Sequence, residues 1–159
     1  MGRLAIAVLR VLLGLILFGC AIAQLWFFPT LAAQLVEAYP ELEWLRWPML
    51  GLVWLIILGA QVGLVAVWVL LGMVQHDRVF TAGAFRWVDV IIAAAVIDTL
   101  LVLSVFVLLS FVVNANPPAL MLTQVALILG GAAFALLMTV MKRLLRQASQ
   151  LTDELSVVI

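Results

Sequence analysis

Residues 87–113 read WVDVIIAAAVIDTLLVLSVFVLLSFVV. The stretch holds no basic residue and only two acidic ones, Asp89 near its start and Asp98 near its middle. A helix of about 20 mainly apolar residues is long enough to cross the hydrocarbon core of a bilayer. Inside that core, only helices and closed barrels can pair all their backbone polar groups. The stretch is therefore predicted to be a membrane-spanning helix.

Three further apolar blocks accompany it, at residues 4–28, 47–74 and 118–141. Apolar residues make up 68% of the chain and charged residues 10%, which leaves too little polar surface to coat a water-soluble protein of this size. We therefore expect a single all-α domain over residues 1–159. It is predicted to be a polytopic membrane protein whose four transmembrane helices pack as a bundle.

The basic residues are distributed unevenly about these spans. If the first span starts in the cytoplasm, seven of the eight basic residues lie at cytoplasmic ends and Arg46 alone lies outside. This predicts N-in, C-in topology in the inner (plasma) membrane, with residues 75–86 inside and 29–48 outside. The formal net charge of zero excludes a nucleic-acid surface based on bulk charge. The seven basic residues predicted to lie at cytoplasmic ends are Arg3, Arg10, Arg78, Arg86, Lys142, Arg143 and Arg146.

The first span also has features of a signal peptide. An early arginine precedes an apolar run that ends in the small-x-small triplet Ala21-Ile22-Ala23. We expect the segment to be retained as a signal-anchor helix. The single cysteine, Cys20, lies within it, so no disulfide can form inside the chain.

The predicted outer loop carries apolar residues at steps of four and three, which favours a short interfacial helix interrupted at Pro40. These residues are Leu31, Leu35, Ala38, Leu42 and Leu45. Glu37 and Glu41 lie on another face of the same helix. The alternative interpretation is an acidic platform for a cationic ligand or partner.

The tail, residues 142–159, is predicted to continue the fourth span as a cytoplasmic amphipathic helix. Its apolar residues follow four-three-four spacing and are Leu144, Ala148, Leu151 and Leu155. We expect this stripe to pack on the inner loop or on a protein partner. Lys142, Arg143 and Arg146 cluster at the membrane end, where each is predicted to bind anionic lipid headgroups.

Asp98 is the sharpest polar exception within the spans. It lies roughly 16 Å along its helix from Trp87, near mid-bilayer. Gln61 is central in the second span, between Gly59 and Gly63. We predict that Asp98 is buried toward the bundle, uncharged or hydrogen-bonded, with Gln61 as its nearest polar side chain on another span. A helix clamp and an ion or proton site are both open roles for this pair.

Other motifs have simpler interpretations. Arg86 and Asp89 are three residues apart, which predicts a cytoplasmic ion pair. His76 is expected to be a solvated loop residue, because one imidazole without a second histidine or a cysteine partner is weak evidence for a metal site. We therefore expect no metal and no cofactor. Four glycines are interpreted as internal helix contacts rather than a dimer interface: Gly14, Gly19, Gly130 and Gly131.

The chain resembles a bacterial family, the domain of unknown function 2975. The resemblance lies in the inner loop HDRVFT, residues 76–81, with Phe85-Arg86 beyond it, and in the endings LLRQA, residues 144–148, and DELSVVI, residues 153–159. Where the family usually has an Asn-containing stretch in the loop, this chain has Ala82-Gly83-Ala84. The resemblance implies four spans and no established activity. Members of this family are often encoded beside small helix-turn-helix regulators, and by analogy the resemblance implies a role in membrane-linked regulation.

Three function classes are open for a chain of unknown biochemical activity. A non-enzymatic regulatory or sensory membrane component, acting through a partner or ligand, fits the short loops and the basic tail. A small oligomeric transporter or channel would need Asp98 to face water or a symmetry axis. An enzyme is disfavoured because no pair of acids, His-Cys set or Ser-His arrangement lies on one membrane side. The expected partners are the lipid bilayer, further copies of the chain and a protein bound at the tail.

Overall fold

A computed structural model describes residues 2–76 and 81–158. Within these ranges the structure has four helices long and apolar enough to cross a membrane, at Arg3–Ala38, Pro40–Gln75, Ala82–Val112 and Pro118–Val157. The four predicted spans are therefore confirmed as helices, and each helix is longer than its apolar block. Asp77 and Arg78 of the predicted inner loop lie outside the described residues.

The first long helix continues without a break into the predicted outer loop and ends there at Ala38. It comprises α1 (Arg3–Ile22), a π-helical turn (Ala23–Phe27) and α2 (Phe28–Ala38). Pro29 lacks a backbone N–H, and the wide turn directly before it lets the helix continue past the proline. The Thr30 hydroxyl donates to the carbonyls of Trp26 and Phe27, 2.9 Å away in each case. The segment predicted to be a separate interfacial helix thus begins as an extension of the first span.

The apolar face expected from Leu31 to Leu45 is split at Tyr39. That residue is non-helical, with φ −134° and ψ 77°, because the following Pro40 disfavours helical geometry before it. A 3₁₀ turn (Pro40–Leu45) then leads into α3 (Arg46–Gln75). As a result Leu45 is buried, whereas Leu31 and Leu35 are exposed.

The last two helices are joined by a short turn. α4 (Ala82–Val107) ends in a π-helical turn (Leu108–Val112), and Asn114 then adopts the left-handed conformation, with φ 56°. Asparagine tolerates this conformation better than most residues. α5 (Pro118–Val158) begins on a proline, whose fixed φ suits the first helical position.

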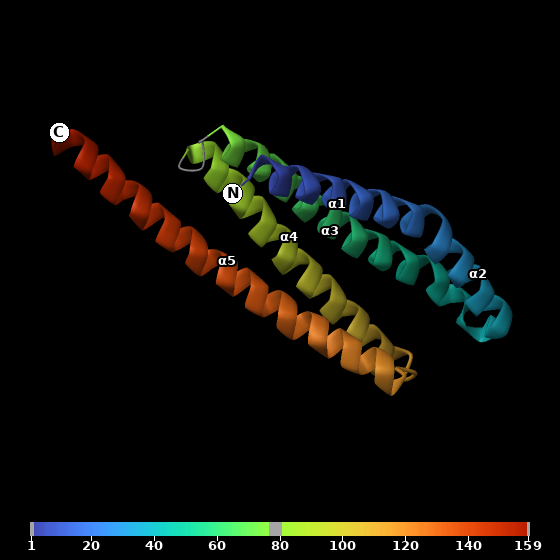
Figure 1. The fold of residues 1–159 in the computed structure, drawn as a ribbon. Helices are drawn as coiled ribbons and strands as arrows, with labels where there is room; N and C mark the ends of the chain where they lie inside the picture. The colour runs from blue at the N-terminus through green and yellow to red at the C-terminus, as the bar shows by residue number, and fades with distance from the viewer. Residues whose placement is uncertain (1, 77–80, 159) are drawn as a thin grey trace.

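The four long helices form an open row. α1 packs on α3, α3 on α4 and α4 on α5, and the described residues show no extensive contact of α5 with α1 or α3. Figure 1 shows α1 and α5 on opposite sides of the α3–α4 pair. The expected bundle therefore does not close. Lipid tails are as apolar as leucine side chains, so no hydrophobic force drives the outer helices together.

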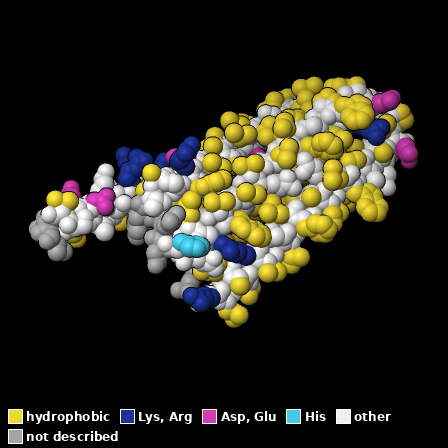
Figure 2. Space-filling view, turned by 90° about the horizontal axis from the view of Figure 1, so that it is seen from above, with side chains coloured by type: hydrophobic (Ala, Val, Ile, Leu, Met, Phe, Trp, Pro, Cys, Tyr) yellow, Lys and Arg dark blue, Asp and Glu magenta, His cyan; other side chains and the backbone are white. Residues whose placement is uncertain are grey.

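The row of helices has two ends, which we name the terminal end and the loop end. The terminal end holds the start of α1, the end of α3, the start of α4 and the far end of α5; the loop end holds the turns near Pro40 and Asn114 (Figure 1). Apolar side chains cover much of the face seen in Figure 2, and most charged side chains lie toward its ends. This distribution is typical of a membrane-spanning protein.

The tail is helical and continuous with the fourth span, as predicted. Its apolar stripe, however, is not covered by the described residues: Leu144, Leu151 and Leu155 are 55%, 61% and 65% exposed. α5 extends past the start of α4, so none of the described helices lies beside its last turns (Figure 1). The prediction that the stripe contacts the inner loop is not met by the described residues.

Candidate functional site

The candidate site lies at the middle of α4, where two consecutive polar residues face different helices. Asp98 faces α3 and Thr99 faces α5. Consecutive helical residues differ by about 100° in direction, which lets one position contact each neighbour of the central helix. Each of the two polar side chains meets a glycine on the facing helix.

The carboxyl group of Asp98 lies directly against Gly59. A Cβ built on Gly59 would overlap the carboxyl oxygens and lie 2.6 Å from Cγ of Asp98. Only glycine therefore leaves room for the acid. Since a glycine hydrogen points where that Cβ would be, the contact is a weak Cα–H···O interaction rather than an ordinary hydrogen bond.

Asp98 and Gln61 are not hydrogen-bonded to each other in the described part of the chain. The Oδ1 atom of Asp98 is buried and has no hydrogen-bond partner there. The reason lies in helix geometry: Gln61 follows Gly59 by two positions, about 200° around α3, so it cannot share the Gly59 face. The glycines that flank Gln61 also differ, because a Cβ on Gly63 would meet nothing within 4 Å.

Thr99 makes the corresponding contact with α5. A Cβ on Gly131 would overlap the Thr99 hydroxyl oxygen. That hydroxyl donates to the carbonyl of Ala95 at 2.7 Å, so it is satisfied within its own helix. Ser104 bonds in the same way to Leu100, at 2.9 Å. Thr99 therefore contributes close packing rather than a free polar group.

An apolar groove of about 230 Å³ lies beside this site, between α3 and α4. Gly59 and Val62 line it from α3. The residues that line it from α4 are Val90, Ala93, Ala94 and Ile97. No polar side chain of the described chain lines the groove.

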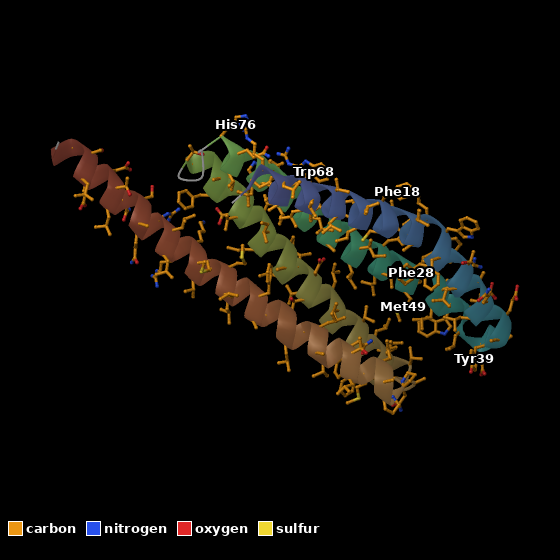
Figure 3. All side chains as sticks on the ribbon, viewed as in Figure 1. Phe18, Phe28, Tyr39, Met49, Trp68 and His76 are labelled. Atoms are coloured by element: carbon orange, nitrogen blue, oxygen red, sulfur yellow. The ribbon has the colours of Figure 1, made fainter. Side chains whose placement is uncertain are left out.

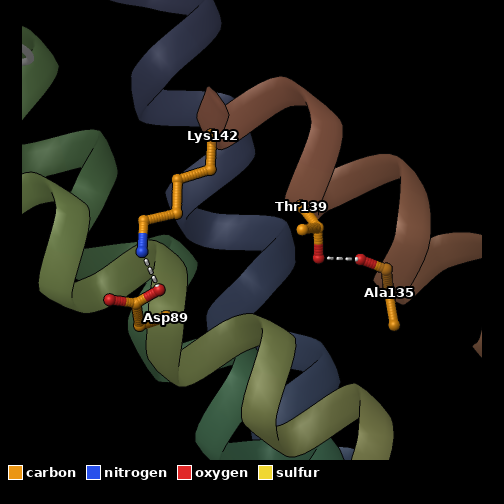
Figure 4. A network of polar contacts seen from close by, with 4 residues as sticks. All are labelled: Asp89, Ala135, Thr139 and Lys142. Carbon is orange, nitrogen blue, oxygen red and sulfur yellow. Dashed lines mark hydrogen bonds and ion pairs between the residues drawn. The ribbon is translucent and has the colours of Figure 1, made fainter. Parts of the chain in front are cut away.

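A second polar cluster joins α4 to α5 at the terminal end. The ammonium of Lys142 pairs with the carboxylate of Asp89 (Figure 4). One helical turn farther along α5, the Arg146 guanidinium lies 5.8 Å from the ring centre of Phe85. The ion pair therefore differs from the one expected between Asp89 and Arg86, because α5 brings Lys142 onto the same face of α4.

These contacts also change the interpretation of the three basic residues predicted to bind lipid headgroups. Lys142 has a side chain only 19% exposed and is paired within the chain, and Arg146 rests on an aromatic ring. Arg143 is exposed and remains a candidate for headgroup contact. The pattern of charges predicted a basic cluster, but it could not show which members face α4.

Sequence reasoning missed a half-buried arginine near the terminal end of α1. Arg10 approaches Gly72 of α3 so closely that a Cβ there would lie 3.1 Å from its Nη2 atom. Its Nε atom is buried and has no hydrogen-bond partner in the described chain. The Nδ1–H group of the exposed His76 donates to the Gly72 carbonyl, 2.9 Å away. The sequence signal for this position was the seven-residue spacing between Arg3 and Arg10, which places both side chains on the same face of a helix.

A polar network at the loop end was also missed. The Asn116 amide donates to Ser110 at 2.9 Å and to the amide oxygen of Gln124 at 3.0 Å. Gln124 is only 4% exposed. The network ties the turn after α4 to the first turns of α5, and a buried polar group needs such partners.

Close helix contacts involve only some of the expected glycines. Gly14 of α1 lies under the ring of Trp68, which Figure 3 labels where α1 and α3 run together, and a Cβ there would be 3.3 Å from the indole. Gly131 contacts Thr99 as described above. Gly19 and Gly130, in contrast, have nothing within 4 Å of a built Cβ. The expectation of internal contacts is therefore met at two of the four positions.

Within the described residues, no group of three or more His, Cys, Asp or Glu side chains could hold a metal ion. Comparison with known proteins finds no match among curated proteins and none among solved structures. A family model described as a protein of unknown function, DUF2975, matches residues 30–159. The match begins in α2 and includes the Gly59–Asp98 contact, the Lys142–Asp89 pair and the whole tail. The chain belongs to the DUF2975 family.

Proposed function

We propose that this protein is a non-enzymatic regulatory or sensory component of the plasma membrane that acts through a partner bound at its tail. The observation that carries the proposal is the exposed apolar stripe of Leu144, Leu151 and Leu155 on a helix that extends past its neighbours. Apolar side chains left in water lose roughly 1.5–3 kcal/mol each relative to burial. A contiguous stripe of this kind marks an interaction surface.

The proposed orientation places both termini and the terminal end of the helical row in the cytoplasm. Seven of the eight basic residues belong to that side, and Arg46 belongs to the other. The tail would then face cytoplasmic proteins. Family members are often encoded beside helix-turn-helix regulators, and this gene neighbourhood is consistent with a cytoplasmic partner.

The orientation predicts the accessibility of single cysteines in intact cells. In a Cys20→Ser background, a membrane-impermeant thiol reagent is expected to label Glu41→Cys without lysis, because residue 41 is exposed on the loop end. Ser149→Cys should be labelled only after permeabilisation. The reverse labelling pattern would contradict the proposed topology.

Deleting the tail after Gln150 is expected to abolish recovery of the partner in mild detergent. The deletion removes Leu151 and Leu155 but leaves the Lys142–Asp89 pair in place. The shortened protein should therefore keep the melting temperature of the full chain. Affinity capture from matched membranes, compared by mass spectrometry, provides the measurement. Unchanged recovery of every co-purifying protein would argue against the proposal.

A small transporter or channel is the second candidate function. One observation favours it: the buried Oδ1 atom of Asp98 has no hydrogen-bond partner among the described residues, near mid-membrane. An acid in that position could carry a proton or bind a cation. An open row of four helices encloses no path, so this function would require several copies of the chain.

A further inference from the structure

α5 carries two helical stripes along its length, and only one of them is used within the chain. The first stripe faces α4, and its residues are buried or half-buried. They recur at steps of three and four, for example at Ile128, Gly131, Ala135, Met138, Lys142 and Leu145. This stripe includes the Gly131–Thr99 contact and the Lys142–Asp89 pair, so it is the contact surface for α4.

The second stripe follows the same alternation of three and four but is exposed throughout. It includes Leu137, Met141, Leu144, Ala148, Leu151 and Leu155, which we name the α5 seam. Exposure within the bilayer is ordinary for an apolar side chain. Beyond the basic cluster that begins at Lys142, however, lipid tails no longer cover the seam.

The spacing of the seam specifies the kind of partner. Steps of three and four repeat every 3.5 residues on average, which is the period that keeps one helix facing another along a left-handed supercoil. We propose that the α5 seam packs against the α5 seam of a second copy of this chain, in parallel and in register. This inference rests on the proposed role of the tail as a docking surface, and it names the occupant.

A second copy of the chain in the same membrane supplies a partner helix in the orientation that the α5 seam requires. Two copies inserted in the same direction present parallel α5 helices with the seam at the same depth. α5 contains no glycine or proline after Gly131, so the tail cannot fold back onto the bilayer without breaking the helix. Gly130 lies in line with the seam, and open space beside it permits close approach of another helix.

The charges of the tail are compatible with a parallel pair. No seam residue is charged, and the flanking positions 147 and 152 are Gln and Thr. In a parallel pair these flanking positions face each other across the interface, where like charges would repel. Two of the three basic side chains at the start of the tail are held against α4, because Lys142 pairs with Asp89 and Arg146 covers Phe85.

Cysteine cross-linking of the full-length protein in native membranes tests the proposal. In a Cys20→Ser background, Leu144→Cys, Leu151→Cys and Leu155→Cys are expected to form a disulfide-linked band of about twice 17.4 kDa under mild oxidation. Gln150→Cys and Asp153→Cys lie off the seam and serve as matched controls that should remain monomeric. Equal cross-linking at all five positions, or none at any, would overturn the proposal.

Mixed samples test the parallel orientation. Antiparallel helices would link Leu144→Cys of one copy to Leu155→Cys of another, while neither variant would link to itself; that pattern would also overturn the proposal. Ala148→Glu places a charge in the seam and is expected to shift the detergent-solubilised protein from dimer to monomer in light scattering. Gln150→Glu should leave the dimer intact.

The same variants separate this inference from the proposed function. Absence of cross-links together with tail-dependent recovery of a different protein would overturn the second-copy assignment alone. Cross-links in a protein whose tail captures no different protein would support the second copy as the partner bound at the tail. Absence of cross-links together with unchanged recovery after deletion of the tail would contradict the proposed function as well. One set of membranes provides both measurements, the cysteine cross-links and the proteins recovered with the tail.

Discussion

Replacing Gly59 with alanine is expected to lower the melting temperature in detergent more than any other single-methyl change on α3. The new Cβ would lie 2.6 Å from Cγ of Asp98, so rotating the carboxyl group alone cannot relieve the overlap. Either Asp98 must change its χ1 rotamer or α3 and α4 must separate. Overpacking of this kind costs roughly 1–3 kcal/mol.

Gly63→Ala is the matched control, because a Cβ there meets nothing within 4 Å. It should leave stability unchanged or raise it, since alanine is favoured over glycine in a helix by about 1 kcal/mol. A double-mutant cycle assigns the cause: Asp98→Ala in the Gly59→Ala background should restore part of the lost stability. A Gly59→Ala protein that melts like the wild type would show that the close contact is not a stabilising feature.

Substitutions of Asp98 itself are expected to have the second large effect. Asp98→Asn keeps the shape that fits against Gly59 and should preserve the fold. Asp98→Leu introduces a larger branched side chain at a contact that admits only a glycine, and it should lower the melting temperature markedly. Thermal unfolding in the same detergent measures both variants.

Gln61→Leu is the control for the role of the amide. Because no hydrogen bond joins Gln61 to Asp98 in the described chain, this change should have little effect on stability. Destabilisation as large as that of Asp98→Leu would revive the predicted clamp between the two side chains. If Asp98→Asn preserves stability but abolishes a proton- or cation-dependent phenotype, the transporter becomes the better-supported function.

The candidate site illustrates what could be predicted and what could not. Composition marked Asp98 as exceptional, since an acid near mid-bilayer is costly whatever its neighbours are. Gln61 was predicted as its partner because the two residues lie at similar depth along their helices. Contact also requires that both side chains point toward each other around their helix axes, and Asp98 instead points to Gly59. The partner of Asp89 was missed for the same reason, because Lys142 is distant in sequence and adjacent only once α5 packs on α4.

The order of residues is enough to predict four helices long and apolar enough to cross a membrane, the start of the fourth near Pro118 and the helical continuation of the tail. These properties depend on local composition, on proline and on the need to pair backbone groups inside lipid. Three features depend instead on how the helices pack: the open row, the contact of Gly59 and Gly131 rather than Gly63 and Gly130 with the central helix, and the exposure of the tail's apolar stripe among the described residues. Apolar helix faces are equally compatible with lipid and with one another, so the pairing of helices follows from close packing, which the order of residues along one helix does not specify.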